Sequence, residues 1–182
     1  MRRRYRYIWI FALTLTSLLH SSSNALTESE AAPSQDNFLY VRRVIDGDTI
    51  KLSDGQNVRL IGIDTPESYY SDKLLRDSKR SSRDIKTILD LGKRASSFTK
   101  ALCLGKKVRL EYDVVKRDKY GRTLAYVYLE DGTFVNAKIL EEGYAQVMTV
   151  PPNVKYANYF LRIQGEARDK NKGLWSREVE NG

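Results

Sequence analysis

The feature that most constrains the fold is a set of three short runs of β-branched and other apolar residues, separated by Asp-Gly turn signals. The turn signals are Asp46-Gly47 and Asp54-Gly55, and the runs span residues 39–45, 49–52 and 57–63. Strand-length runs punctuated in this way are typical of antiparallel hairpins. The segment is therefore predicted to form a three-stranded meander.

The second turn also predicts the strand register. A two-residue loop at Asp54-Gly55 places Asp48 opposite the far end of the third run, near the point where Asp64 leaves it. The same register sets Arg59 opposite Ile50, on the sheet face that carries Asp48. Asp48 and Asp64 are thus predicted to meet at one rim of the sheet, with the Arg59 guanidinium pointing toward them.

The rest of the chain adds two strands and three helices to this meander. Apolar residues between Ile88 and Leu102 recur at steps of three and four, which predicts an amphipathic helix after a polar stretch that begins at Ser68. The other expected elements are strands at 107–114 and 123–129, a short helix at 136–142, and a last helix from Tyr156 to Ala167 that ends near Gly173 and is held by Trp175. This order predicts an α+β fold, a five-stranded OB-fold barrel with three helices.

The first 25 residues have the pattern of an export signal. Four arginines flank the start of an almost uncharged run from Tyr7 to Leu19, and Ser23-Asn24-Ala25 offers small residues for cleavage. An uncleaved interfacial anchor is the alternative, although polar and acidic residues follow Ala25 directly. The predicted organisation is a signal peptide at 1–25, a disordered lead-in at 26–37 and one folded domain at 38–178 of a secreted or periplasmic protein.

Histidine and cysteine usage exclude whole classes of chemistry. His20, the one histidine, lies in the signal segment, so the mature chain has no Ser-His or Cys-His nucleophile and no histidine-ligated zinc. The single cysteine, Cys103, can form no internal disulfide, and its apolar neighbours favour a buried small hydrophobe over a reactive thiol. Any metal must then be held by oxygen ligands, which points to calcium, magnesium or manganese.

Three segments carry the groups that phosphodiester hydrolysis around one hard cation requires; they span 46–49, 59–67 and 118–122. Asp48 and Asp64, with the Thr65 carbonyl and several waters, would make an oxygen site suited to calcium. Each segment also has an ordinary structural interpretation: a hairpin turn at 46–48, a helix start at 64–67 capped by Thr65, and a polar loop at 118–122 with Arg122 in solvent. The presence of all three segments, in this order, favours the functional interpretation.

In these segments, and in Leu124-Ala125-Tyr126-Val127-Tyr128 and Leu174-Trp175-Ser176, the chain resembles the staphylococcal nuclease family from about Leu39 to Trp175. The resemblance implies an OB-fold nuclease that depends on Ca²⁺. The roles that it implies are calcium ligation by Asp48, Asp64 and the Thr65 carbonyl, positioning or deprotonation of water by Glu67, phosphate binding by Arg59 and Arg122, and nucleotide contacts by Lys119 and Tyr120. For Tyr120, packing in the core is the alternative.

Two segments depart from the family pattern. Residues 68–91 make a longer connection than in the family and contain six basic residues, so they are either a substrate-gripping flap or a solvated mobile loop. The segment Met148-Thr149-Val150-Pro151-Pro152 lacks the tyrosines that wall the nucleotide pocket in the family. The substrate preference therefore does not follow from the resemblance.

The function that these observations favour is that of an exported, calcium-dependent endonuclease. Loss of the four signal arginines lowers the formal net charge from +8 to +4, which still attracts polyanions mildly. DNA and RNA are the expected substrates, cut with little sequence specificity to leave 3′-phosphate ends, by a monomer without a stable protein partner. Two rivals stay open: a non-catalytic OB-fold module that binds single strands, and a calcium-stabilised extracellular interaction domain.

Overall fold

The computed structural model describes residues 39–81 and 84–176. The predicted signal peptide and lead-in, at 1–25 and 26–37, lie outside these residues, as do both ends of the predicted domain, so these assignments stay predictions. In the described part of the chain, no helix combines the length and the apolar character needed to cross a membrane.

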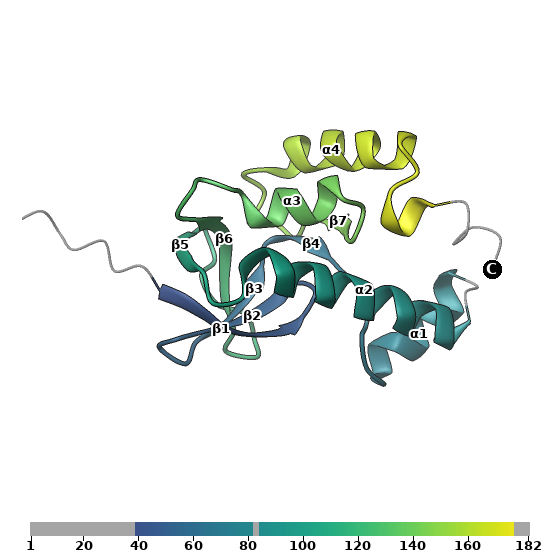
Figure 1. Cartoon of the computed structure of the whole chain (residues 1–182), viewed down its shortest axis with the longest axis horizontal. Helices are drawn as coiled ribbons and strands as arrows, with labels where there is room; N and C mark the ends of the chain where they lie inside the picture. Colours follow the sequence, from purple (N-terminus) through teal and green to yellow (C-terminus); the bar gives the residue numbers. More distant parts are fainter. Residues whose placement is uncertain (1–38, 82–83, 177–182) are drawn as a thin grey trace, which may run out of the picture. The chain divides into compact units, whose positions relative to one another are not determined.

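Five strands close into a barrel, as predicted (Figure 1). In order around the barrel they are β1 (Leu39–Asp46), β2 (Thr49–Leu52), β3 (Asn57–Leu60), β6 (Thr123–Leu129) and β5 (Lys107–Glu111). Neighbouring strands are antiparallel except β3 and β6, which are parallel. Pairing of β1 with β5 closes the barrel, and its interior is filled by fully buried side chains such as Val41, Ile50 and Val58.

The third predicted strand, 57–63, is divided between two sheets. β3 ends at Leu60, and the next residues form β4 (Gly62–Asp64), which pairs with β7 (Gln146–Met148) in a separate two-stranded sheet. A run of apolar residues does not reveal that its pairing partner changes midway, so the prediction of one continuous strand was wrong. After the break, Asp64 pairs with Gln146 in the second sheet and is not part of the barrel.

The predicted register of the β2–β3 hairpin was wrong by one residue. Arg59 pairs with Thr49 and not with Ile50. The loop has three residues, because Gly55 N donates to the Leu52 carbonyl at 3.1 Å. Gly55 has φ 91°, the left-handed conformation that completes a type I turn followed by a bulge. An Asp-Gly pair is compatible with two-residue and three-residue loops. The sequence pattern does not distinguish the two lengths, and the shorter loop was the one predicted.

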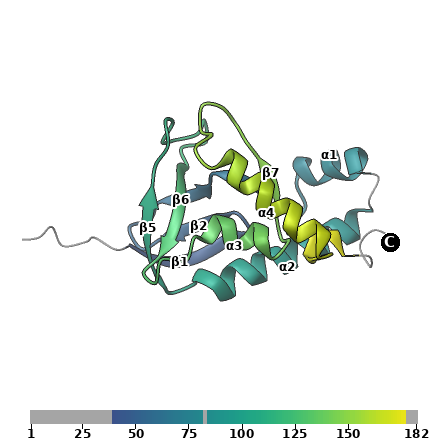
Figure 2. The ribbon, with the colours of Figure 1, turned by 90° about the horizontal axis from the view of Figure 1, so that it is seen from above.

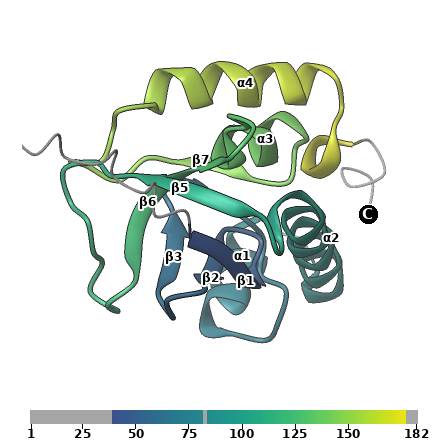
Figure 3. The same ribbon diagram turned by 60° about the vertical axis from the view of Figure 1, so that its left-hand side comes forward.

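Within residues 39–81 and 84–176, four α-helices accompany the barrel, one more than predicted. They are α1 (Asp72–Ser81), α2 (Ile85–Cys103), α3 (Val135–Glu141) and α4 (Ala157–Asp169), followed by a 3₁₀ turn at Gly173–Trp175. Seen from above, α4 crosses over α3 (Figure 2). Figure 3 shows α2 running beside the strands, and α1 packs against α2.

Helix α1 lies within the segment 68–91, so the expectation of a loop there was wrong. Ser71 caps the helix, since its hydroxyl accepts a hydrogen bond from Leu74 N at 3.1 Å. Leu74 is fully buried and anchors the helix, while its other positions are mostly charged. One buried anchor gives no periodic apolar signal, and this explains why the helix was not predicted.

Two expectations about the core are confirmed. Cys103 is fully buried, and burial raises the pKa of its thiol to about 12, so it behaves as a small hydrophobe. Trp175 packs with Leu91 and Leu174 and so holds the end of the described chain against α2.

Asn136 fastens α3 to the barrel, because its side chain donates to the Ile61 carbonyl at 2.9 Å.

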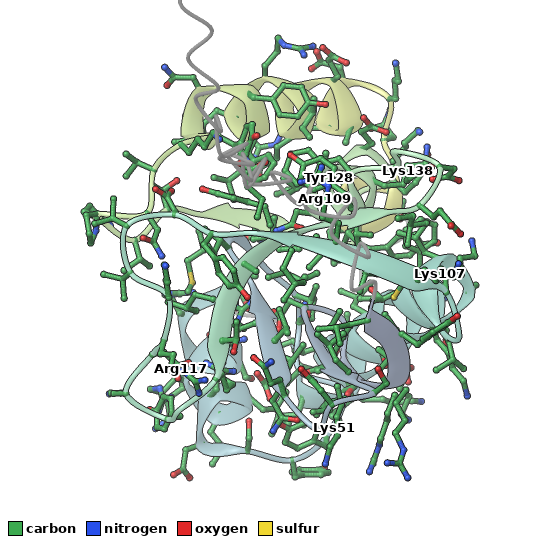
Figure 4. All side chains as sticks on the ribbon, turned by 90° about the vertical axis from the view of Figure 1, so that its left-hand side faces the viewer. Lys51, Lys107, Arg109, Arg117, Tyr128 and Lys138 are labelled. Carbon is green, nitrogen blue, oxygen red and sulfur yellow. The ribbon has the colours of Figure 1, made fainter. Side chains whose placement is uncertain are left out.

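The outer face of β5 and β6 carries an aromatic and basic pair, in which the Arg109 guanidinium lies 4.6 Å from the centre of the Tyr128 ring (Figure 4). The Tyr128 hydroxyl donates to the Tyr156 hydroxyl at 3.1 Å and ties the start of α4 to the sheet. Figure 4 also shows Arg117 in the β5–β6 loop, well apart from this pair. That loop continues into the segment 118–122 of the candidate site.

Candidate active site

The turn between β1 and β2 positions Asp48. The turn is anchored to α2, because the Thr99 hydroxyl donates to the Gly47 carbonyl at 2.7 Å. Asp48 lies in the turn just before β2, its carbonyl accepts a hydrogen bond from Leu60 N at 2.9 Å, and its side chain reaches Arg59 in spite of the shifted register. Its Oδ2 accepts hydrogen bonds from Thr65 N at 2.9 Å and from Thr65 Oγ1 at 3.1 Å. These bonds fasten the turn to the segment that follows β4.

Arg59 connects the two aspartates predicted to bind the metal. Its Nη1 lies 3.0 Å from Asp48 Oδ2, and its Nη2 donates to Asp64 Oδ1 at 2.8 Å. Nη1 also donates to the carbonyls of Ile63 at 2.9 Å and Leu60 at 3.3 Å. Arg59 is only 9% exposed, so these charge-assisted bonds hold the end of β3 and the start of the next segment in a fixed relation. The predicted meeting of Asp48, Asp64 and Arg59 is thus present.

Glu67 reaches the site from a segment held between two helices. Residues 65–67 have no helical structure, so the alternative in which Thr65 caps a helix is wrong. The backbone at Glu67 packs directly on Gly92 of α2, where an added Cβ would lie 2.1 Å from the Glu67 carbonyl oxygen. The buried Glu67 carboxylate accepts a hydrogen bond from the Ser71 hydroxyl at 3.1 Å. Helix α2 therefore sets the Glu67 backbone, and the start of α1 sets its carboxylate.

Lys73 of α1 was not among the predicted site residues, yet it lies at the centre of the cluster. Its Nζ is 2.9 Å from Glu67 Oε1, 3.2 Å from Asp64 Oδ1 and 3.2 Å from the Thr65 carbonyl oxygen. The side chain is 32% exposed, so the ammonium is partly withdrawn from water. Ser71 followed by Asp72 is a typical signal for the start of a helix, and the basic residues Lys79 and Arg80 are typical of a last turn. This pattern could have revealed α1. Which residue then faces the carboxylates depends on the path of the connection, and no local pattern specifies that path.

The electrostatics of the cluster reflect crowded carboxylates in poor contact with water. Burial and the charge of Asp48 raise the pKa of Asp46 to about 6. Burial also raises the pKa of Asp64, although Lys73 opposes this change. Burial lowers the pKa of Lys73, but the attraction of Asp64 and Glu67 outweighs it and leaves that pKa above its ordinary value. The site is a concentration of negative charge that stabilises a cation.

A groove of about 370 Å³ adjoins the cluster and contains the second arginine. It is lined by Arg59, residues 60–63, Val115, residues 118–120, Arg122, Leu124, Met148 and residues 150–153. Arg122 Nε donates to Asp118 Oδ2 at 2.7 Å within its own loop. Burial tends to raise the pKa of Asp118, but the hydrogen bonds from Arg122 hold it below its usual range. Arg122 is therefore a paired groove residue and not simply a solvated charge.

Tyr120 stands at the edge of this groove and is 72% exposed, so the alternative that places it in the core is wrong. Lys119 Nζ lies 5.0 Å from the centre of its ring, and the Arg122 guanidinium lies 5.6 Å away. An exposed ring flanked by cations is suited to stack on a base while the cations face the backbone phosphates. Where tyrosines were expected at 148–152, the groove has an apolar wall of methionine, valine and prolines.

The predicted site residues fall into two neighbouring groups. The carboxylate cluster contains Arg59, Asp48, Asp64, Thr65 and Glu67, and the groove contains Arg59 again with Lys119, Tyr120 and Arg122. Their chemical roles stay predictions. Besides Lys73, the sequence did not identify the residues that position the cluster, which are Ser71, Gly92 and Thr99. They act through contacts between different elements of the fold, and such contacts leave no local signal in the sequence.

The oxygen atoms of the cluster fit a hard cation. Glu67 Oε1, Asp64 Oδ1 and the Thr65 carbonyl converge within 3.2 Å on one positive group, the Lys73 ammonium. Carboxylate and carbonyl oxygens are the donors that calcium takes in proteins. Within residues 39–81 and 84–176, no three Asp, Glu, His or Cys side chains could hold a metal ion by themselves. Two of the predicted ligands, Asp64 and the Thr65 carbonyl, belong to this group of oxygens, whereas the third, Asp48, is bonded to Thr65 N and Arg59. The ligand set of Asp48, Asp64, the Thr65 carbonyl and water stays a prediction.

Comparison with known proteins identifies the family. The model of the family described as staphylococcal nuclease homologue matches residues 57–177. The thermonuclease of Staphylococcus intermedius is 45% identical over 140 residues, which cover 75% of either chain. The thermonuclease of Staphylococcus hyicus is 42% identical over 139 residues, 75% of this chain and 74% of the relative. Endonuclease YncB of Bacillus subtilis is 37% identical over 140 residues, 74% of this chain and 60% of the relative. The chain belongs to the staphylococcal nuclease homologue family.

Proposed function

We propose that this protein is an exported, calcium-dependent endonuclease that hydrolyses the phosphodiester bonds of DNA and RNA. The observation that carries the proposal is one cluster beside a groove that contains Arg122: Asp48 and Asp64 meet at Arg59, and Thr65 and Glu67 join them through contacts with Asp48 and Lys73. The relatives named thermonuclease and endonuclease support the same activity.

Arg59 and Arg122 bind the scissile phosphate in this proposal. Both line one groove, and a guanidinium can donate two parallel hydrogen bonds to phosphate oxygens. Negative charge on those oxygens increases during in-line attack, so donors already in place stabilise the transition state more than the substrate. Arg59 is held by its bonds to Asp48 and Asp64, and Arg122 by its bond to Asp118. Neither guanidinium has to be ordered when substrate arrives.

In this proposal, Glu67 is the general base that deprotonates the attacking water. The one histidine, His20, lies in the predicted signal segment, so a carboxylate is the side chain best suited to accept the proton of the attacking water near neutral pH. Asp48 and Asp64 are both bonded to Arg59 and serve as calcium ligands, which leaves Glu67 for this task. Its carboxylate is oriented by Ser71 at 3.1 Å, and its backbone is held against α2.

Asp48, Asp64 and the Thr65 carbonyl are the proposed calcium ligands. Bound calcium would supply positive charge to the phosphate oxygens and bring water close to the phosphorus. Magnesium demands stricter octahedral geometry than two carboxylates and a carbonyl impose, so it should substitute poorly. Low sequence specificity follows from recognition through phosphate, which carries little base information. The 3′-phosphate products are inferred from the family resemblance.

Export is proposed from the basic start and the cleavage site at Ser23-Asn24-Ala25. N-terminal sequencing of the protein recovered from medium or periplasm should begin at Leu26. Recovery of the intact segment 1–25 on membranes would favour an anchor instead.

The test of the activity uses mature protein with plasmid DNA or RNA in calcium, in magnesium and in excess chelator. We expect cleavage of both substrates in calcium, weak cleavage in magnesium and none in chelator. Asp64→Asn should abolish cleavage in calcium, whereas Asp90→Asn, on the exposed face of α2, should cleave like the wild type. DNA binding without cleavage in calcium would support the non-catalytic binding module.

A further inference from the structure

The inference concerns Lys73, whose position is defined by the start of α1. Ser71 is bonded both to Leu74 N and to the Glu67 carboxylate, each at 3.1 Å. Leu74 is fully buried, so the first turn of α1 is fixed between the domain interior and Glu67. Lys73 lies between these two anchors. Its ammonium is therefore directed to the cluster by the fold and does not arrive there as a free surface charge.

The ammonium contacts the groups assigned to the metal and to water. Its three N–H bonds have three acceptors, Glu67 Oε1 at 2.9 Å, Asp64 Oδ1 at 3.2 Å and the Thr65 carbonyl at 3.2 Å. A calcium ion needs such oxygens at about 2.3 to 2.6 Å. Two cations at one set of oxygens repel each other strongly and compete for the same lone pairs. Arg59 Nη2 also contacts Asp64 Oδ1, but the Lys73 ammonium contacts the Thr65 carbonyl as well, so it lies where a calcium ion bound to both oxygens would lie. The ammonium and the ion therefore exclude each other.

We propose that Lys73 is a tethered competitor for the calcium site, which holds the carboxylates together in calcium-free protein and must leave when calcium binds. The proposal rests on the metal site of the proposed function. Because the binding-competent state is only a fraction of the calcium-free protein, the apparent calcium affinity is reduced by that fraction. Lys73 thus sets the calcium concentration at which the site is filled.

The structure also contains a second partner for the displaced ammonium. Asp77 lies one helical turn from Lys73 on α1, with its Oδ2 3.9 Å from Nζ. A cavity of about 190 Å³ is lined by Asp64, Thr65 and Asp77, among others. A four-carbon side chain can rotate toward Asp77 with no movement of α1. Displacement therefore exchanges one carboxylate partner for another and does not require the helix to unfold.

Calcium titration by calorimetry tests the proposal with a matched control. Lys73→Met removes the competitor, and we expect its calcium dissociation constant to fall about tenfold, which corresponds to about 1.4 kcal/mol. Lys79→Met removes the same charge from an exposed position of the same helix, and its dissociation constant should stay within about twofold of the wild type. Equal tightening in both variants, or none in Lys73→Met, would overturn the proposal. No calcium binding by any of the three proteins would overturn the metal site as well.

A measurement on the wild-type protein makes the test independent of variant folding. The ¹⁵N-labelled ammonium of Lys73 should give a hydrogen-exchange-protected signal in calcium-free protein, because three acceptors surround it. Saturating calcium should remove that protection and leave the folded backbone spectrum. Protection that persists at saturating calcium would show that the ammonium and the ion occupy different places, and the proposal would fail.

Discussion

Replacement of Gly92 by alanine should disturb the site from a distance. A Cβ at position 92 would lie 2.1 Å from the Glu67 carbonyl oxygen and 2.7 Å from Ser68 N, both backbone atoms that no rotamer change can move. Ordinary van der Waals contact begins at 3.4 Å, so the Glu67 backbone or α2 must shift by more than an ångström. If α2 shifts, the bond from Thr99 to the Gly47 carbonyl shifts with it. Either response moves part of the cluster.

Two free-energy terms oppose each other in this variant. Alanine in a helix interior is favoured over glycine by about 1 kcal/mol. Overpacking of a close contact costs about 1 to 3 kcal/mol, and the short contact distance places this substitution toward the upper end. A net loss of about 1 to 2 kcal/mol is expected. Displacement of a catalytic group by about 1 Å typically costs on the order of a hundredfold in rate.

The control is the same substitution at Gly165, the other glycine inside a described α-helix. Gly165 of α4 has no atom within 4 Å of its added Cβ, so Gly165→Ala should stabilise the protein by about 0.5 to 1 kcal/mol and leave turnover unchanged. Urea unfolding and cleavage of a fluorescent oligonucleotide at saturating calcium supply the two readouts. A Gly92→Ala protein as stable as Gly165→Ala, with turnover within about threefold of the wild type, would refute the positioning role of Gly92.

Further predictions separate catalysis, binding and packing. Arg122→Lys should lower turnover by about a hundredfold with little effect on DNA affinity or stability, because lysine loses the forked donor pair; an equal loss in affinity would contradict it. Arg59→Lys should lower turnover similarly. It should also destabilise the protein by about 1 to 3 kcal/mol, because this buried guanidinium bonds two aspartates and two carbonyls. An Arg59→Lys protein that unfolds in urea like the wild type would count against the predicted loss of stability. Hydrogen bonds from Lys138 and Lys172 lower the pKa of Glu142. The stability that they add is therefore present above pH 4.5, the ordinary pKa, and is lost as the pH falls below it. Glu142→Gln should cost up to about 1 kcal/mol at pH 7 and less at pH 3.5, and an equal cost at both pH values would exclude this linkage.

Local sequence patterns predicted the barrel and the principal cluster because both depend on short-range signals. Asp-Gly turns delimit the strands, and the chain returns after them so that Asp48, in the first turn, and Asp64, at the end of β4, both reach Arg59. The one-residue register error did not separate Asp48 from Arg59, since Asp48 lies in a turn. Composition alone predicts that any metal here is held by oxygen ligands, and this stays a prediction.

The remaining features depend on contacts that sequence periodicity does not encode. Helix α1 has a single fully buried residue, Leu74, so its apolar pattern is too sparse to distinguish a helix from a loop. The approach of Gly92 to Glu67 joins residues on two elements, and only the folded chain shows how close they are. The place of Lys73 follows from both features, because α1 and α2 together fix the path of residues 68–71.

The central claim is that Glu67 deprotonates water in a calcium-dependent phosphodiester hydrolysis. The most direct measurement is the turnover of Glu67→Gln at saturating calcium and DNA, on protein whose calcium and DNA affinities have been measured separately. Glutamine keeps the shape and can still pair with Ser71, but it cannot accept the proton. We expect a turnover lower by about a hundredfold or more, with both affinities near those of the wild type. A turnover within about threefold of the wild type would contradict it.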